Sequence, residues 1–284
     1  MTVIDPSIDC VDFSAQARLV HKWTEESGQH VVVEGLRGSS RAFFLAKLIK
    51  AQKRPVVIFT ADQNRGEALL EDLKYFFRHE KIKINPCFFP AWELLPYEPL
   101  SPLNEISGER LDILNRLRTE EPLVLVVPLE AGLQKVMPRL VLEKLILPVK
   151  RGMSLDREFL EACLSENGFT RSALVESRGE FSVRGDIVDF FQPGGMNPLR
   201  VEFFGDEVES IREFDALSQV SFNELEAVNI LPVRELCLSD AEKKQGIEAL
   251  KDFAEKNACD RLALKELLEK IEHLGVFSGM EYLA

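Results

Sequence analysis

The sequence VVVEGLRGSSRAFFLAKLIK, residues Val31 to Lys50, has the layout of a strand, a tight loop and a helix. Three valines lead into a loop of glycines and serines, and an apolar segment with helical character begins near Arg41. This order is typical of a phosphate-binding loop, in which backbone N–H groups at the start of the helix point toward an anion. The sequence therefore predicts an α/β domain of the nucleotide-binding type.

The loop itself departs from the phosphate-binding pattern G-x-x-x-x-G-K-[ST]. The matching frame begins at Gly35 and includes Gly38. Ser40 replaces the second glycine of the pattern, Arg41 replaces its lysine, and Ala42 replaces the hydroxyl that binds Mg²⁺. Because the metal ligand is lost and a Cβ stands where backbone should approach the phosphates, we expect no ATP binding. Arg41 can still pair with an oxyanion, so weak anion binding is the alternative.

Apolar runs alternate with helical segments over roughly the first 130 residues. We expect strands at residues 30–34, 54–62, 84–92 and 122–128, and helices at residues 14–26, 43–49, 68–76 and 105–117. Continuous apolar strands that alternate with helices are typical of a parallel sheet covered on both faces. The predicted fold class for this part is a doubly wound α/β domain.

The pattern changes in the second half of the chain. Residues 154–169 predict a helix with Ser154 as its N-cap and with Asn167-Gly168 as its stop. Strand-like segments follow within residues 172–194, 197–215 and 224–233, with turn signals at Gly179, at Gly194-Gly195 and at Gly205. We therefore expect an α+β domain with an antiparallel sheet backed by a helix, and then a helical tail from residue 239.

Charge and hydropathy exclude several functions. The chain has 284 residues and a formal net charge of −12, which disfavours a unit that grips nucleic acid through its phosphates. No apolar run approaches the roughly 20 residues of a membrane span, and the N-terminus lacks the features of a signal peptide. These observations predict a cytoplasmic protein with protein partners. We expect a monomer.

No group of residues predicts chemistry at a catalytic, metal or cofactor site. The five cysteines are far apart in the sequence, at Cys10, Cys87, Cys163, Cys237 and Cys259. The four histidines are equally scattered, so neither a metal site nor a disulfide framework is expected. Asp186 and Asp189 fall on opposite faces of an alternating strand, which argues against a carboxylate pair for acid–base catalysis.

The segment PAWELLPYEPLSP allows two interpretations. Its four prolines favour extended backbone, and Trp92 and Tyr97 add large amphipathic rings. A loop that stacks on DNA or binds a partner is one interpretation. A long connection that its aromatic side chains fix to the domain surface is the one we favour.

Two longer blocks resemble a known family. They are FFPAWELLPYEPLSPLNEISGERLDIL, residues 88–114, and RGEFSVRGDIVDFFQPGGMNPLRVEFFGDEVESIREFDALSQ, residues 178–219. Both resemble the N-terminal region of bacterial transcription-repair coupling factors and, more weakly, the UvrB subunit of the excision nuclease. In this family a helicase-like α/β domain with a degenerate phosphate loop is split by a smaller α+β domain. The resemblance implies a first part at residues 1–131, an inserted domain at 132–216 and a return segment at 217–284.

The family resemblance also implies a function. It predicts a non-catalytic module that recruits UvrA to stalled RNA polymerase in nucleotide excision repair. Because motor motifs are absent, it implies an N-terminal part of a longer protein that also binds RNA polymerase and double-stranded DNA as an ATP-dependent translocase. The alternatives are a UvrB-like ATPase that processes DNA damage with an atypical loop, and a DNA-binding module that the net charge disfavours.

The expected UvrA-binding residues lie in the inserted domain. UvrB-type domains meet UvrA through arginines, and Arg171 and Arg184 fall where that pattern puts them. Arg178 lies between them, and the three arginines suit pairing with carboxylates of a partner. Phe181 and Phe191 are apolar anchors in this interpretation, although the hydrophobic core is the alternative that we favour for both. At Ser182 the sequence lacks a further arginine of UvrB, which implies a smaller interface.

Overall fold

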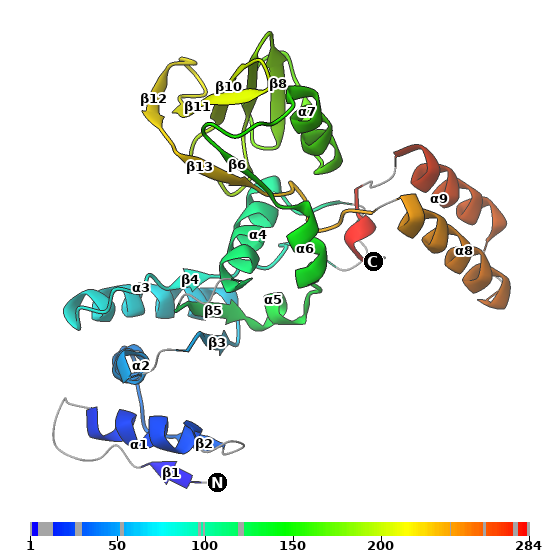
Figure 1. Ribbon diagram of the computed structural model, residues 1–284. Coiled ribbons are helices and arrows are strands. Elements are labelled where there is room, and N and C mark those ends of the chain that lie inside the picture. Colours follow the sequence, from blue (N-terminus) through cyan, green and yellow to red (C-terminus); the bar gives the residue numbers. More distant parts are fainter. Residues whose placement is uncertain are drawn as a thin grey trace. The chain divides into compact units, whose positions relative to one another are not determined.

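The computed structural model describes residues 2–4, 14–25, 30–51, 54–95, 98, 100–118, 122–238, 240–257, 260–274 and 278–282. The chain divides into two compact units. Figure 1 labels the helices and strands of both. The first unit contains Met1–Ala91 and Ile113–Lys135, and the second contains Trp92–Asp112 and Val136–Ala284.

The first unit contains a three-stranded parallel sheet in the order β3 (Val56–Thr60), β5 (Val124–Pro128) and β4 (Cys87–Phe88). The central strand β5 is buried along its whole length. Val124 and Val126 pack in one cluster with helices α2 (Ser40–Ala51) and α3 (Gln63–His79). Leu125 and Val127 pack in another with α4 (Asn104–Arg118) and α5 (Leu129–Leu133). The prediction of a parallel strand covered on both faces is thus confirmed for β5.

Two expected strands of the first unit differ from the prediction. Strand β2 (Val31–Val33) pairs in parallel with β1 (Thr2–Ile4), rather than with the sheet of β3, β5 and β4. The strand expected at residues 84–92 is confined to β4, because Pro86 and Pro90 flank it and have no N–H to donate. Helix α1 (Ser14–Glu25) and α2 pack on β2, through a cluster that contains Ala17, Val20 and Phe44.

The second unit contains a six-stranded sheet in the order β12-β11-β10-β9-β8-β7. Its strands are β7 (Thr170–Arg171), β8 (Glu180–Arg184), β9 (Ile187–Phe190), β10 (Leu199–Phe204), β11 (Glu207–Phe214) and β12 (Ser221–Glu224). All neighbours are antiparallel except β7 and β8, which are parallel. Helix α7 (Arg157–Glu166) packs Leu160 and Leu164 into the core under this sheet. The expected antiparallel sheet backed by a helix is therefore present.

The cap of α7 differs from the expected one. Asp156 is the N-cap, and its side chain accepts a hydrogen bond from the backbone N–H of Glu158 at 2.7 Å. Ser154 instead forms an isolated bridge with Glu207. The predicted stop is confirmed, because Asn167 caps the helix and Gly168 has a φ of +87°, a conformation that favours glycine.

The remaining elements are a helix, a two-stranded sheet and the helical tail. Helix α6 (Arg139–Leu145) precedes β6 (Leu147–Lys150), which pairs antiparallel with β13 (Ala227–Ile230). The predicted helical tail is present as α8 (Asp240–Asn257), α9 (Arg261–Leu274) and a short 3-10 helix (Met280–Tyr282). Within the described ranges, no helix combines the length and the apolar character needed to cross a membrane.

An ion cluster joins α2 to the end of α3. The carboxylate of Glu80 lies 2.8 Å from Lys47 Nζ and 3.0 Å from Lys50 Nζ, and His79 Nδ1 lies 3.6 Å away. Hydrogen bonds from Lys47 and Lys50 favour the charged carboxylate and lower the pKa of Glu80 from 4.5 to about 2.

This shift predicts a pH-dependent contribution to stability. In the unfolded chain the pKa of Glu80 returns to its ordinary value, so the contribution is complete above about pH 4.5 and is lost as the pH falls toward 2. We expect Glu80→Gln to lower the urea midpoint at pH 7, with a difference from the native chain that shrinks between these pH values. Glu71→Gln, at an exposed glutamate of α3, is the control. A difference that stays constant across this range would contradict the assignment.

Candidate functional site

In the degenerate loop, residues 35–42, side chains form hydrogen bonds with the backbone of the loop itself. Ser40 Oγ accepts a hydrogen bond from the backbone N–H of Arg37 at 2.8 Å and donates to its carbonyl at 2.7 Å. Arg41 Nε donates to the carbonyl of Leu36 at 3.3 Å. Ala42 is fully buried between α2 and α3. The position that aligns with the Mg²⁺ ligand of the phosphate-loop sequence pattern therefore carries a methyl group in the hydrophobic core.

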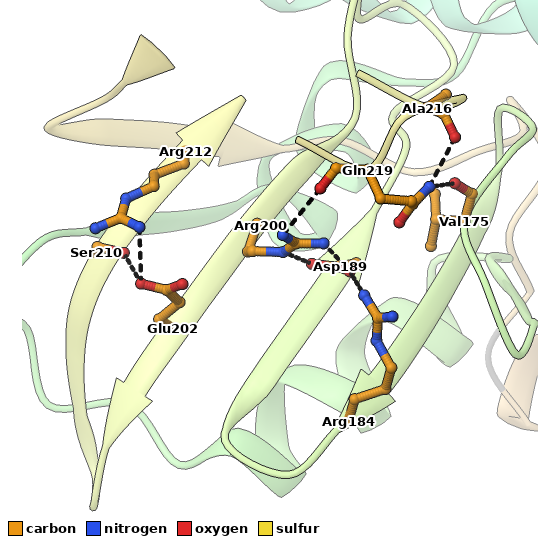
Figure 2. Close-up of polar contacts among 9 residues, drawn as sticks. All are labelled: Val175, Arg184, Asp189, Arg200, Glu202, Ser210, Arg212, Ala216 and Gln219. Carbon is orange, nitrogen blue, oxygen red and sulfur yellow. Dashed lines mark hydrogen bonds and ion pairs between the residues drawn. The ribbon is translucent and has the colours of Figure 1, made fainter. Parts of the chain in front are cut away.

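The six-stranded sheet has one apolar face and one polar face. Because side chains alternate along a strand, most apolar residues lie on one face and most polar residues on the other, with Ile187 an apolar exception on the polar side. The apolar face packs against α7 and includes Phe181, Val188, Phe190, Val201 and Ile211. The opposite face, which we call the polar face, carries Ser182, Arg184, Asp189, Arg200, Glu202, Ser210 and Arg212. Figure 2 shows all of these side chains except Ser182.

Asp189 is the centre of the polar face. Its carboxylate is fully buried, and Arg200 holds both oxygens through Nε at 2.8 Å and Nη2 at 2.9 Å. Arg184 Nη2 donates to the same carboxylate at 2.6 Å. The hydrogen bond to Asp189 raises the pKa of Arg200 above its ordinary value, since the partner carboxylate favours the charged form.

A loop between β11 and β12 is fastened to this cluster. Arg200 Nη1 donates to the carbonyl of Gln219 at 3.4 Å. The Gln219 amide nitrogen donates to the carbonyls of Val175 at 3.1 Å and Ala216 at 2.7 Å (Figure 2). The guanidinium of Arg200 also lies over the ring of Phe214, 4.7 Å from its centre. Arg200 is therefore held from several sides.

A second ion pair continues the polar face toward its edge. Glu202 accepts a hydrogen bond from Ser210 Oγ at 2.6 Å and lies 3.5 Å from Arg212 Nη1. The polar face thus alternates acidic and basic groups across the four strands β8 to β11, and the guanidinium groups of Arg184 and Arg212 are the more exposed members of their pairs.

The three predicted arginines have separate partners. Arg171 pairs with Glu161 of α7, at the edge of the sheet. Arg178 donates to the carbonyls of Pro193 and Gly195, at 2.6 Å each, and fastens that turn. Arg184 alone reaches the polar face, where it is ion-paired with Asp189 and about half exposed. The structure therefore does not join them into one cluster through direct contacts.

Both predicted apolar anchors are buried. Phe181 belongs to the core beneath α7 and is 1% exposed. Phe191 is 8% exposed and packs with Val175 and Phe214, with Arg178 over its ring. A side chain that its own domain covers has no free surface for a partner, so the core alternative holds for both phenylalanines. They support the strands that carry the arginines.

The sequence interpretation missed the central pair of the site. Arg200 and Glu202 alternate with Val201 and Phe203, a signal that they share the face opposite the core. The sequence around Asp189 does not predict its role. A buried carboxylate is stable only beside a positive charge, and Arg200 is placed opposite Asp189 by the pairing of β9 with β10. Asp186, which the sequence analysis considered as a second carboxylate for acid–base catalysis, is exposed in the β8–β9 turn.

The proline-rich segment is fixed by its tryptophan. Trp92 is buried and its Nε1 donates to Glu235 at 2.9 Å, as expected of a pinned connection. Tyr97 lies outside the described residues, as do Cys10 and Cys259. The other cysteines are free thiols, and burial raises the pKa of Cys237 to about 11. No cluster of three or more metal-ligating side chains occurs among the residues that the structure describes.

Comparison with known proteins finds a family match over the domain that contains the six-stranded sheet. Residues 147–236, which contain the whole six-stranded sheet, match the family described as UvrB interaction domain. A transcription-repair-coupling factor of Myxococcus xanthus is 36% identical over 261 residues, covering 90% of this chain and 22% of that protein. The one of Escherichia coli K12 is 32% identical over 210 residues, covering 74% and 18%. The UvrABC system protein B of Legionella pneumophila is 29% identical over 271 residues, covering 87% and 41%.

The chain spans about a fifth of the length of these coupling factors. Residues 147–236 thus form a UvrB interaction domain, and most of the chain is similar to the N-terminal regions of transcription-repair-coupling factors.

Proposed function

We propose that this chain is a non-catalytic recruitment module that binds UvrA through the polar face of its six-stranded sheet. The observation that carries this proposal is the position of Arg184: it lies inside the matched interaction domain, on the sheet face opposite α7, and its side chain is 44% exposed. Guanidinium groups pair well with carboxylates across protein interfaces. The expected partner surface is therefore acidic.

Arg171 contributes from the edge of the same sheet. Its side chain is 61% exposed and its ion pair with Glu161 is a surface contact that a partner carboxylate can replace at small cost. Arg178 has a different role, because it fastens the Pro193–Gly195 turn, and we assign it to support of the interface.

The non-catalytic part of the proposal rests on the degenerate loop. The Mg²⁺-ligand position is a buried methyl group, and the Ser40 hydroxyl is already bonded to Arg37. That the chain binds no nucleotide stays a prediction.

The wider role of the protein belongs to the same proposal. In a longer parent protein, which we expect to be a cytoplasmic ATP-dependent translocase on double-stranded DNA, the module would recruit UvrA to stalled RNA polymerase for nucleotide excision repair. The division into residues 1–131, 132–216 and 217–284 and the monomeric state are likewise proposed.

Titration of the chain with purified UvrA tests this interface. We expect Arg184→Ala to weaken binding about tenfold and Arg171→Ala about threefold, because truncating interface arginines removes charge-assisted hydrogen bonds. Arg139→Ala is the matched control, since Arg139 is similarly exposed but lies on α6 outside the matched domain. Unchanged binding in Arg184→Ala would remove the polar face as the UvrA-binding surface, and unchanged binding in Arg171→Ala would remove only the contribution of the sheet edge.

A further inference from the structure

We propose that Asp189 is a positioning residue, which holds the Arg184 guanidinium in place for a partner without cancelling its charge. The inference rests on the proposed function, since Arg184 is the contact residue there. It assigns a role to a carboxylate that no partner can reach, because Asp189 is fully buried.

The two arginines on Asp189 are not equivalent. Arg200 is 13% exposed and binds both carboxylate oxygens. Arg184 is 44% exposed and reaches Asp189 through one nitrogen, Nη2. Arg200 therefore neutralises the carboxylate from within the sheet, and the charge of Arg184 remains in excess at the surface.

The carboxylate is itself immobilised, which is what a positioning role requires. Arg200 is tied to the Gln219 carbonyl and lies over the Phe214 ring. The next acidic group along β10, Glu202, is engaged by Ser210 and Arg212, so it does not draw Arg200 away from Asp189. Asp189 also lies opposite Arg200 in the β9–β10 register, with both strands fixed in the core through Val188, Phe190 and Val201.

The consequence for binding is a smaller ordering cost. A free arginine side chain has many rotamers, and fixing it at an interface reduces affinity. The bond to Asp189 selects the Arg184 conformation before the partner arrives. We expect loss of this bond to weaken partner binding about threefold to tenfold, the factor that corresponds to ordering one rotamer-rich side chain.

A double-mutant cycle on the full chain tests the inference. The four proteins are the native chain, Asp189→Asn, Arg184→Ala and the double variant, each titrated with purified UvrA. We expect Asp189→Asn to weaken binding in the native background and to have no further effect in the Arg184→Ala background, because Asp189 acts only through Arg184. Equal weakening in both backgrounds would show a merely structural role and would overturn the inference. Unchanged or tighter binding by Asp189→Asn would overturn it as well.

The outcomes separate this inference from the proposed function. If Arg184→Ala weakens binding while Asp189→Asn does not, the positioning role fails and the interface stands. If Arg184→Ala itself has no effect, the interface fails and the positioning role falls with it. Asp189→Asn leaves Arg200 without its carboxylate, and this variant could unfold for that reason. The variant Asp189→Asn/Arg200→Gln removes both charges and gives a second measurement in that case. It should bind the partner about threefold to tenfold more weakly than the native chain does, and native-like binding by this folded variant would overturn the inference.

Discussion

Replacing Glu235 by glutamine should lower the free energy of unfolding by about 3 kcal/mol, the size expected when a buried ion pair is broken. Arg110 of α4 is fully buried, and its Nε and Nη2 donate to the two oxygens of Glu235 at 2.5 and 3.2 Å. The same carboxylate accepts the hydrogen bond from Trp92, whose ring lies 5.4 Å from the Arg110 guanidinium. Glutamine keeps an acceptor for Trp92 but removes the charge that balances the buried guanidinium.

The matched control removes both charges. The double variant Arg110→Met/Glu235→Gln leaves no buried guanidinium, so it should recover at least half of the lost stability, because apolar replacement of a buried ion pair is often neutral. Urea unfolding followed by circular dichroism measures each free energy. A double variant that is less stable than Glu235→Gln alone would show that packing of the arginine stem, rather than charge balance, dominates at this place.

This ion pair also shows where sequence reasoning ends. The apolar run of β5 and the Gly205-Asp206 turn between β10 and β11 are local signals, and both elements are where they were predicted. The ion pair of Arg110 and Glu235 joins residues more than a hundred positions apart, and no local sequence pattern predicts it. The partner of β2 is of the same kind: its three valines predict a strand, while the strand beside it depends on tertiary packing.

The candidate site was also predictable only where local sequence patterns determine it. The resemblance pointed to the arginines of the inserted domain, and residue alternation explains why Arg184 leaves the core. The separate partners of Arg171 and Arg178 depend on α7 and on the Pro193–Gly195 turn, which are distant in sequence. The buried Asp189 is stable as an anion only beside Arg200, so its importance follows from the strand register and not from the chain order.

Gly108→Ala should be the second strongly destabilising change. Gly108 lies in α4, where alanine normally favours a helix, yet a Cβ there would lie 2.3 Å from Gly194 N and 2.4 Å from the Pro193 carbonyl carbon. These are backbone atoms of the turn that Arg178 fastens, so they cannot rotate away as a side chain can. We expect a loss of about 3 kcal/mol, at the upper end for an overpacked site.

Gly246→Ala is the matched substitution in a helix with open space. Gly246 is exposed in α8, and no atom lies within 4 Å of the added Cβ. Here the helix propensity of alanine acts alone, so this variant should gain about 0.5–1 kcal/mol. The sign of the same Gly→Ala change therefore depends on whether a neighbouring backbone occupies the Cβ position. Thermal melting of the two variants beside the native chain checks this, and a Gly108→Ala protein as stable as Gly246→Ala would mean that α4 and the turn are not in close contact in solution.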